Sequence, residues 1–274
     1  PDFYPTDALE DADGSLLVSD TGAWYVDACP ISRVAKPEVK GAIYRIRKTD
    51  AKTVADPWGK AIAWDTLSTK DLVELLSDTR LRVNDRALAA LVLQDTKATK
   101  LLGQALSKSR NDHTRLLALT ALRQVKDPAS VRHIRTALDD PSQDVRMAAA
   151  QALGDLKDVA AIDKLIRLLH SGTSPEQRAA AEALGHIGNP KATAQLLMAA
   201  AKPMDRFTEH AVIYALIEIA DQSLVHAQLE GAKASPVGKA ALIVLDQLKY
   251  PKLNAAHVIP FLDSPEPALR KTGL

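Results

Sequence analysis

The stretch that decides the fold is LDDPSQDVRMAAAQALG, which runs from Leu138 to Gly154. It opens with a turn rich in Asp and Pro and continues as a segment whose apolar residues recur at spacings of three and four, as on one face of a helix. Leucines stand at the same place in five related stretches, at steps of 29 to 32 residues. These register leucines are Leu91, Leu122, Leu153, Leu184, Leu216 and Leu245. A period near thirty residues predicts stacked structural units.

A small or β-branched residue stands four positions before each register leucine. These residues are Ala87, Ala118, Ala149, Ala180, Val212 and Ala241. About twenty residues upstream of each leucine lies a second amphipathic segment, and breakers such as Asp140-Pro141-Ser142 separate the two. Because Ser or Asp can cap a helix and Pro fits its first turn, each unit is predicted to be a helical hairpin. Pro, Gly or Asp interrupts the apolar helical pattern every dozen residues, which argues against a continuous coiled coil.

The same stretch resembles the HEAT repeat of the short, bacterial, phycobilisome-lyase-like type. In the fifth and sixth units Glu209 and Gly238 replace the basic residue that Arg115 and Arg146 supply. The resemblance implies a mainly α fold, a right-handed α-solenoid of about six to seven HEAT-type hairpins over residues 68–274. The units are expected at about 68–95, 96–126, 127–157, 158–188, 189–220, 221–250 and a truncated 251–274.

Composition agrees with a helical repeat, because 46% of the 274 residues are hydrophobic but only 4% are aromatic. The net charge is +1, divided into −3 over residues 1–67 and +4 over the remainder. Spread over seven repeats, this excess is too small for a nucleic-acid-binding stripe. The single cysteine, Cys29, excludes an internal disulfide framework. The sequence contains no run of eighteen apolar residues, so no membrane-spanning helix is predicted.

Residues 1–50 carry strand signals, and residues 51–67 are predicted to be a linker or cap. An Asp13-Gly14 turn and the alternating segment Ala42–Arg47 favour three strands near residues 6–11, 16–20 and 42–48. The stretch Pro5–Gly22, closed by Gly41–Ile46, resembles a terminal blade of a β-propeller.

With Trp24-Tyr25, Cys29-Pro30 and the junction Ile62–Ser68, the whole chain resembles large bacterial proteins of the membrane-bound dehydrogenase type. Those proteins join a glucose/sorbosone-dehydrogenase-like propeller to HEAT repeats. The resemblance implies an extracytoplasmic or periplasmic location and a fragment of a longer protein. It also implies that this chain alone holds no cofactor, because a quinone site would need several blades.

No catalytic or metal-binding motif is evident. Asp7, Asp11, Asp13 and Asp20 could bind calcium, but the spacing lacks the Asp-x-Asp-x-Asp-Gly pattern. No two of the seven histidines stand four apart on one helix, and neither GxSxG nor SxxK occurs. Trp24, Tyr25, Trp58 and Trp64 could stack on a ligand, although packing against the first helices explains them better. No catalytic, cofactor-binding or metal residue is therefore predicted.

The second helix of each unit lines the concave side in HEAT solenoids, so its exposed face is the best candidate for binding. Positions two and six before the register leucines in the central units mix polar and apolar groups, including the Arg and Tyr that interfaces favour. The candidate residues are Met147, Gln151, Arg178, Glu182, His210 and Tyr214.

The leading hypothesis from sequence is a non-catalytic scaffold whose partner is a protein or another domain of its parent, with end-to-end self-association possible. An alternative is the C-terminal part of a quinone-dependent sugar or aldehyde dehydrogenase. A second alternative is a HEAT-like lyase or nucleic-acid-binding protein, which the weakly charged concave set does not favour.

Overall fold

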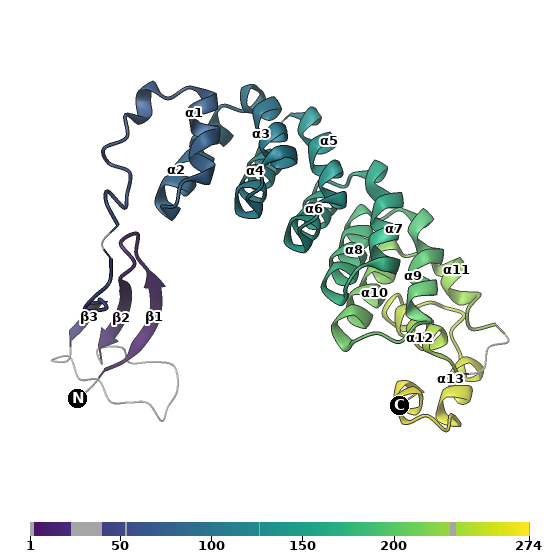
Figure 1. The fold of residues 1–274 in the computed structure, drawn as a ribbon. Helices are drawn as coiled ribbons and strands as arrows, with labels where there is room; N and C mark the ends of the chain where they lie inside the picture. The colour runs from purple at the N-terminus through teal and green to yellow at the C-terminus, as the bar shows by residue number, and fades with distance from the viewer. Residues whose placement is uncertain (1–2, 23–39, 53, 126, 231–233, 274) are drawn as a thin grey trace. The chain divides into compact units, whose positions relative to one another are not determined.

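A computed structural model describes residues 3–22, 40–52, 54–125, 127–230 and 234–273 of the chain (Figure 1). The chain divides into two compact units, Pro1–Ala90 and Leu91–Leu274. Cys29, Trp24 and Tyr25 lie outside the described residues.

The first unit contains a three-stranded antiparallel sheet. Its strands are β1 (Pro5–Glu10), β2 (Leu16–Gly22) and β3 (Lys40–Ile46), in the order β1-β2-β3. Gly14 adopts a positive φ of 77° in the turn after β1, and the Asp13 carboxylate accepts a hydrogen bond from the Ser15 N–H at 3.0 Å. The predicted small antiparallel sheet is confirmed.

Three of the four carboxylates that could bind calcium contact other groups of the first unit, and Asp7 accepts a hydrogen bond from the neighbouring Ala8 N–H. Asp11 and Asp13 both pair with the guanidinium of Arg45, at 2.6 and 3.2 Å. Asp20 accepts hydrogen bonds from the backbone N–H groups of Tyr4 and Gly22. Among the described residues, no group of three or more His, Cys, Asp or Glu side chains is arranged to hold a metal ion.

Two helices complete the first unit: α1 (Thr69–Glu74) and most of α2 (Leu81–Leu93). Ser68 and Asp71 form a capping box that starts α1. The indole N–H of Trp64 donates to the Gly59 carbonyl at 2.8 Å, and the Arg86 guanidinium of α2 lies 4.3 Å from the centre of the Trp64 ring. Trp64 therefore packs against α2, whereas 40% of Trp58 is exposed.

In the second unit, helices alternate between the first and the second position of a hairpin. The first helices are α3 (Thr96–Lys108), α5 (Pro128–Thr136), α7 (Ile162–Ser171), α9 (Thr193–Ala200), α11 (Gln222–His226) and α13 (Ala255–Leu262). The second helices are α4 (Asp112–Gln124), α6 (Gln143–Asp155), α8 (Ser174–Ile187), α10 (Arg206–Ile219), α12 (Pro236–Gln247) and α14 (Pro267–Arg270).

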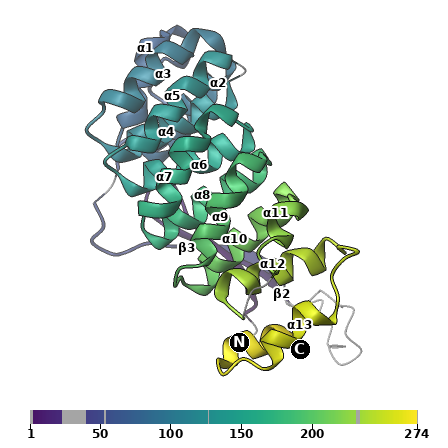
Figure 2. The same ribbon diagram turned by 90° about the vertical axis from the view of Figure 1, so that its right-hand side faces the viewer.

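First and second helices form two rows, and the hairpins follow one another in chain order (Figures 1 and 2). Along the second row, α4 contacts α6, α6 contacts α8, α8 contacts α10 and α10 contacts α12. The confirmed fold is thus a mainly α solenoid. No helix among the described residues is long and apolar enough to cross a bilayer.

The core of the stack lies between the two rows. All six register leucines are fully buried, and so are the six small or β-branched residues four positions before them. Each leucine contributes on the order of 1.5–3 kcal/mol by leaving water. Because most of their partners are alanines, successive second helices can approach closely.

Two glycines mark the points of closest approach in the second row. A Cβ atom on Gly154 of α6 would lie 2.8 Å from the Cα of Ala183 in α8, and one on Gly185 would lie 2.8 Å from the Cα of Ala215 in α10. Real Cβ atoms do not come this close to backbone, so glycine is required at both positions for the observed spacing.

Polar caps start the second helices at defined residues. Thr173 and Glu176 form a capping box at α8, and Ser235 accepts a hydrogen bond from the Gly238 N–H at α12. At α10, Asp205 accepts from the N–H groups of Phe207 and Thr208. The Thr208 hydroxyl and these backbone donors lower the pKa of Asp205 to about 2.

Replacing Gly154 with Val is expected to destabilise the protein by about 1 to 3 kcal/mol, because the side chain would push α6 away from α8. Equilibrium urea unfolding measures this change. Gln151→Val is the matched control, since Gln151 lies on the exposed face of the same helix and should change the free energy of unfolding by less than about 0.5 kcal/mol. Equal effects of the two substitutions would contradict the close approach.

The lowered pKa of Asp205 predicts that the stability of the protein falls as the pH is lowered. Its folded pKa of about 2 lies below the ordinary value of 3.8, so its stabilising contribution is present above about pH 4 and is lost as the pH falls to about 2. Asn caps a helix nearly as well but does not titrate. Urea unfolding at pH 5, 4, 3 and 2 should therefore show the advantage of the unsubstituted protein over Asp205→Asn shrinking across this window. Parallel pH profiles would exclude this role.

Candidate interaction surface

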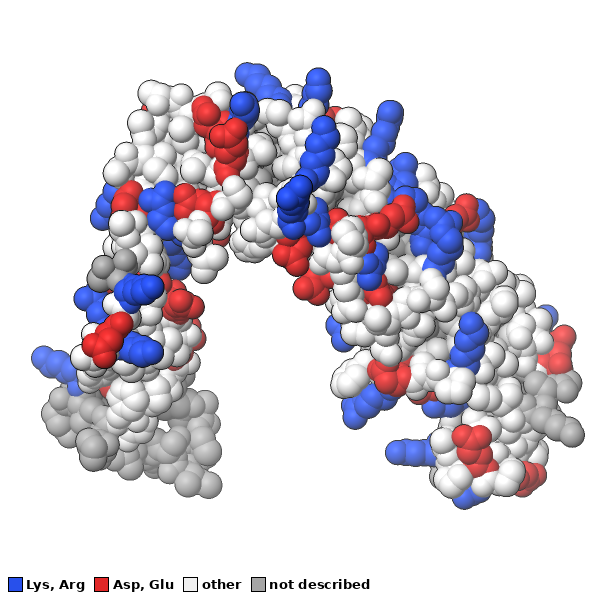
Figure 3. Space-filling view, in the orientation of Figure 1, with Lys and Arg blue, Asp and Glu red and all other residues white. Residues whose placement is uncertain are grey.

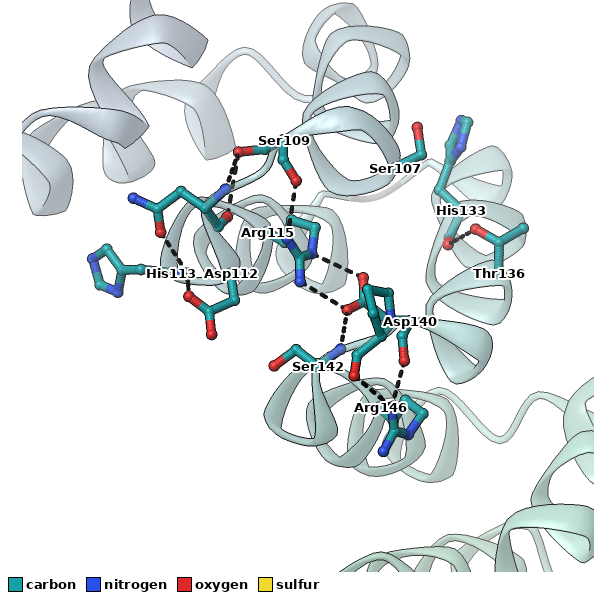
Figure 4. Close-up of polar contacts among 12 residues, drawn as sticks. Ser107, Ser109, Asp112, His113, Arg115, His133, Thr136, Asp140, Ser142 and Arg146 are labelled. Atoms are coloured by element: carbon teal, nitrogen blue, oxygen red, sulfur yellow. Dashed lines mark hydrogen bonds and ion pairs between the residues drawn. The ribbon is translucent and has the colours of Figure 1, made fainter.

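Polar contacts near the N-termini of the second helices from α4 to α12 orient these helices relative to one another. Arg115 of α4 forms a bidentate ion pair with Asp140, in which Nε and Nη2 each lie 2.9 Å from a carboxylate oxygen. Asp140 also accepts a hydrogen bond from the Ser142 N–H at 2.8 Å, just before α6 begins. Figure 4 shows that Arg115 reaches across from one unit to the turn of the next. The pair therefore fixes α4 relative to α6.

A second ion pair connects the next two helices of the row, α6 and α8. Arg146 of α6 donates to the carbonyl oxygen of Asp140 and pairs through Nε with the Glu176 carboxylate at 2.5 Å. Only 2% of Glu176 is exposed. Burial raises the pKa of this carboxyl, but the Thr173 N–H and the Arg146 guanidinium together outweigh burial and hold the pKa below its usual value. Glu176 thus remains charged and ties α6 to α8.

Between α10 and α12 the order of the charges is reversed: the acidic residue lies on the earlier helix and the basic residue on the later one. Glu209 of α10 occupies the position of Arg115 and Arg146 in its unit, and it pairs with Lys239 of α12 at 2.7 Å. Between α8 and α10, the Thr208 hydroxyl donates to the Ser174 carbonyl at 3.3 Å. Glu209 and Gly238 therefore stand in regular helices, and the inter-helix contact is kept with reversed polarity.

These contacts position the six candidate residues, which we call the second-helix face. Met147 and Gln151 lie on α6, Arg178 and Glu182 on α8, and His210 and Tyr214 on α10, all at least partly exposed. Because the residues of each pair stand four apart, they are neighbours on one helix. The face thus spans three adjacent second helices.

Side chains within the face also contact each other. The Arg178 guanidinium lies 3.2 Å from the Glu182 carboxylate. On α10, the imidazole of His210 and the ring of Tyr214 are nearly parallel, 5° apart, with their centres separated by 6.3 Å. An exposed ion pair of this kind contributes little to folding, so its charges remain available to a partner.

Phe207 belongs to the same surface but was not among the predicted residues. It is 60% exposed, with the Arg206 guanidinium 5.1 Å from its ring centre. It stands three residues before His210 and therefore lies one turn further along the same face of α10. The prediction sampled only positions two and six before each register leucine. The scarcity of aromatic residues in the repeats was the signal that could have identified Phe207.

Structural contacts explain the lowered pKa values of the carboxyl groups. Each carboxylate whose pKa is lowered caps a helix or a turn, or pairs with an arginine, or does both. These residues are Asp11, Asp13, Asp56, Asp71, Asp78, Asp127, Glu176 and Asp205. Within the described part of the chain, the second-helix face combines exposed aromatic rings with charged side chains, and such groups can contact a binding partner.

Comparison with known proteins identifies the type of repeat in part of the chain. A family model described as HEAT repeats matches residues 99–181 and 137–217. No curated protein sequence matches the chain. The structure of Kap121p bound to Pho4p is similar, with a TM-score of 0.54 and 16% identity over 80% of this chain and 29% of that one.

A second solved structure is the complex of CpcE and CpcF of phycocyanin lyase from Nostoc sp. PCC7120. It has a TM-score of 0.46 and 22% identity, over 76% of this chain and 86% of that one. At such identities the likeness concerns the fold alone. The stacked hairpins show an α-solenoid, and the family match identifies its units over residues 99–217 as HEAT repeats.

Proposed function

We propose that this chain is a non-catalytic scaffold that binds another protein, or another domain of the same protein, through the second-helix face. The observation that carries the proposal is the exposed aromatic stripe on α10. Only four Phe, Tyr or Trp residues follow position 90. Two of them, Phe207 and Tyr214, are 60% and 48% exposed on this one helix face, whereas Phe261 is buried.

Exposed rings on a rigid helix suit binding because little conformational entropy is lost when a partner covers them. Aromatic residues and arginine also dominate the binding energy of protein interfaces. Arg178 on α8 and the aromatic stripe on α10 lie on helices in direct contact, so one partner segment can engage both. The similarity to a Kap121p structure with bound Pho4p supports a protein as the class of partner.

The N-terminal sheet supports an interdomain role. All residues of β1 and β3 are exposed, including the apolar side chains of Leu9, Tyr44 and Ile46. A three-stranded sheet needs an apolar face covered for stability. We propose that this sheet packs against further strands, as the last blade of a propeller of the glucose/sorbosone-dehydrogenase type would.

The second-helix face is tested by combining Arg178→Ala, His210→Ala and Tyr214→Ala in the full chain. Proteins retained from a lysate of the source cells are quantified by mass spectrometry, and the affinity of each is then measured by calorimetry. Truncating a single hot-spot side chain costs about 2 kcal/mol or more, so the affinity should fall at least about tenfold. Adding Phe207→Ala should weaken binding further.

The matched control combines Met198→Ala and Ile259→Ala. Both side chains are exposed and apolar, but they lie on first helices, α9 and α13. The control should retain the same proteins with unchanged affinity. If the triple variant and the control bind those proteins equally well, the second-helix face is not the binding surface.

A further inference from the structure

Positive charge is concentrated in one part of the solenoid. Residues 94–136 contain nine basic and three acidic residues, a net charge of +6, although the whole chain carries only +1. This segment comprises α3, α4 and α5. Averaging the charge over all seven repeats conceals the concentration.

Some of these charges are neutralised by ion pairs between units. Arg115 pairs with Asp140, Arg123 pairs with Asp155 at 2.7 Å, and Arg135 pairs with Asp158 at 2.7 Å. Five basic side chains remain exposed and have no ion pair with any residue that the structure describes. We call these five the basic face: Lys97, Lys100, Lys108, Arg110 and Arg132.

None of the three acidic residues of the segment forms an ion pair with a residue of this face. Asp127 caps α5 through the Ala129 N–H at 2.9 Å. Asp112 lies in the first turn of α4, where it accepts from the His113 N–H. Asp95 immediately precedes α3. Helix α3 itself contains three lysines and no acidic residue, and α5 contains two arginines and no acidic residue.

The lysines of α3 form one continuous stripe. Lys97, Lys100 and Lys108, with Gln104 between the last two, are exposed at spacings of three and four, whereas Leu102 and Leu106 are buried beneath them. At 1.5 Å per residue, the stripe extends for about 16 Å along the helix.

Helix α5 lies directly beside this stripe. A Cβ atom on Gly103 would come within 2.5 Å of the His133 ring, so the absence of a side chain there lets the imidazole pack onto α3. Figure 4 shows His133 on α5 facing the part of α3 that carries Ser107. Arg132 is the neighbour of His133 and is exposed at the same helix pair. Figure 3 shows Lys and Arg side chains projecting from this region.

We propose that the basic face is a second docking site, which binds an extended acidic segment of another polypeptide. An extended chain rises about 3.3 Å per residue, so five or six residues match the length of the α3 stripe. Carboxylates on such a segment would meet unpaired ammonium and guanidinium groups, which gives complementary potentials at low cost in desolvation.

The surroundings favour an acidic polypeptide over a nucleic acid or a membrane. Helices α3 and α5 contain no Phe, Tyr or Trp on which bases could stack, and no large exposed apolar side chain that could enter a bilayer. The free positive charge thins out along the first row. On α7, Lys164 pairs with Asp139, and Arg167 is the one exposed basic residue without an ion pair to a described residue. Helix α9 contains no basic residue and exposes Met198.

The probe is a fluorescein-labelled (Asp-Glu)4 peptide, titrated with the full chain and followed by fluorescence anisotropy in 50 mM NaCl. Combining Lys97→Gln, Lys100→Gln, Lys108→Gln and Arg132→Gln should weaken binding at least about tenfold, because four of the five charges are removed. Gln104→Glu alone should weaken it by about threefold, since it places a carboxylate within the stripe. Circular dichroism melts confirm that these surface variants remain folded.

The matched control is Lys48→Gln, Lys202→Gln, Lys252→Gln and Lys271→Gln, which lowers the net charge by the same amount at exposed sites elsewhere. Its affinity should stay within about twofold of the unsubstituted protein. An equal loss in both quadruple variants would overturn the proposal, because binding would then follow net charge alone. Tighter binding of duplex DNA or of phosphatidylserine vesicles through the same four residues would overturn it too.

Discussion

The close approach of successive second helices is the constraint on which the rest of the solenoid depends. Gly154 and Gly185 remove the side chains that would separate α6, α8 and α10, and a buried row of alanines continues the contact. A single hairpin of this size cannot bury its apolar face, so each unit is stable only against its neighbours. The same packing leaves the opposite side of each second helix exposed, and on α6, α8 and α10 this side carries the second-helix face.

Polar contacts then select one arrangement among those that the small residues permit. Arg115 with Asp140 and Arg146 with Glu176 place oppositely charged groups from adjacent units in contact. Separating either pair would leave a largely buried charge without a partner, which is strongly unfavourable. The contact between Glu209 and Lys239 shows that the polarity can be reversed without losing this selection. Complementarity between units therefore matters more than the identity of either residue.

The two rows of helices differ in the chemistry that they present. The second row carries aromatic rings on α10 and an internally paired arginine on α8, which suit a partner with apolar side chains. The first row carries unpaired lysines on α3 and the unpaired Arg132 on α5, which suit carboxylates. A scaffold with two such faces can hold two segments of one partner, or two partners, at a distance set by the rigid hairpins between them.

Patterns within a single helix or turn were readable in the sequence. The register leucines and the alanines four residues earlier predicted the hairpins, because helical periodicity is local. The Asp13-Gly14 turn likewise predicted the small sheet. The candidate residues of α8 and α10 were located on one helix face for the same reason, although Phe207 was missed because only two positions per helix were considered.

The sequence by itself determined the repeating hairpins, since three- and four-residue spacings specify which side of each helix is buried. Only the tertiary structure decided which charges are neutralised and which remain free. Arg115 and Asp140 are 25 residues apart, and Arg146 and Glu176 are 30 apart. Likewise, nothing near Gly103 in the chain indicates that His133 packs against it. These groups meet only when one unit stacks on the next, so their pairing depends on the geometry of the stack.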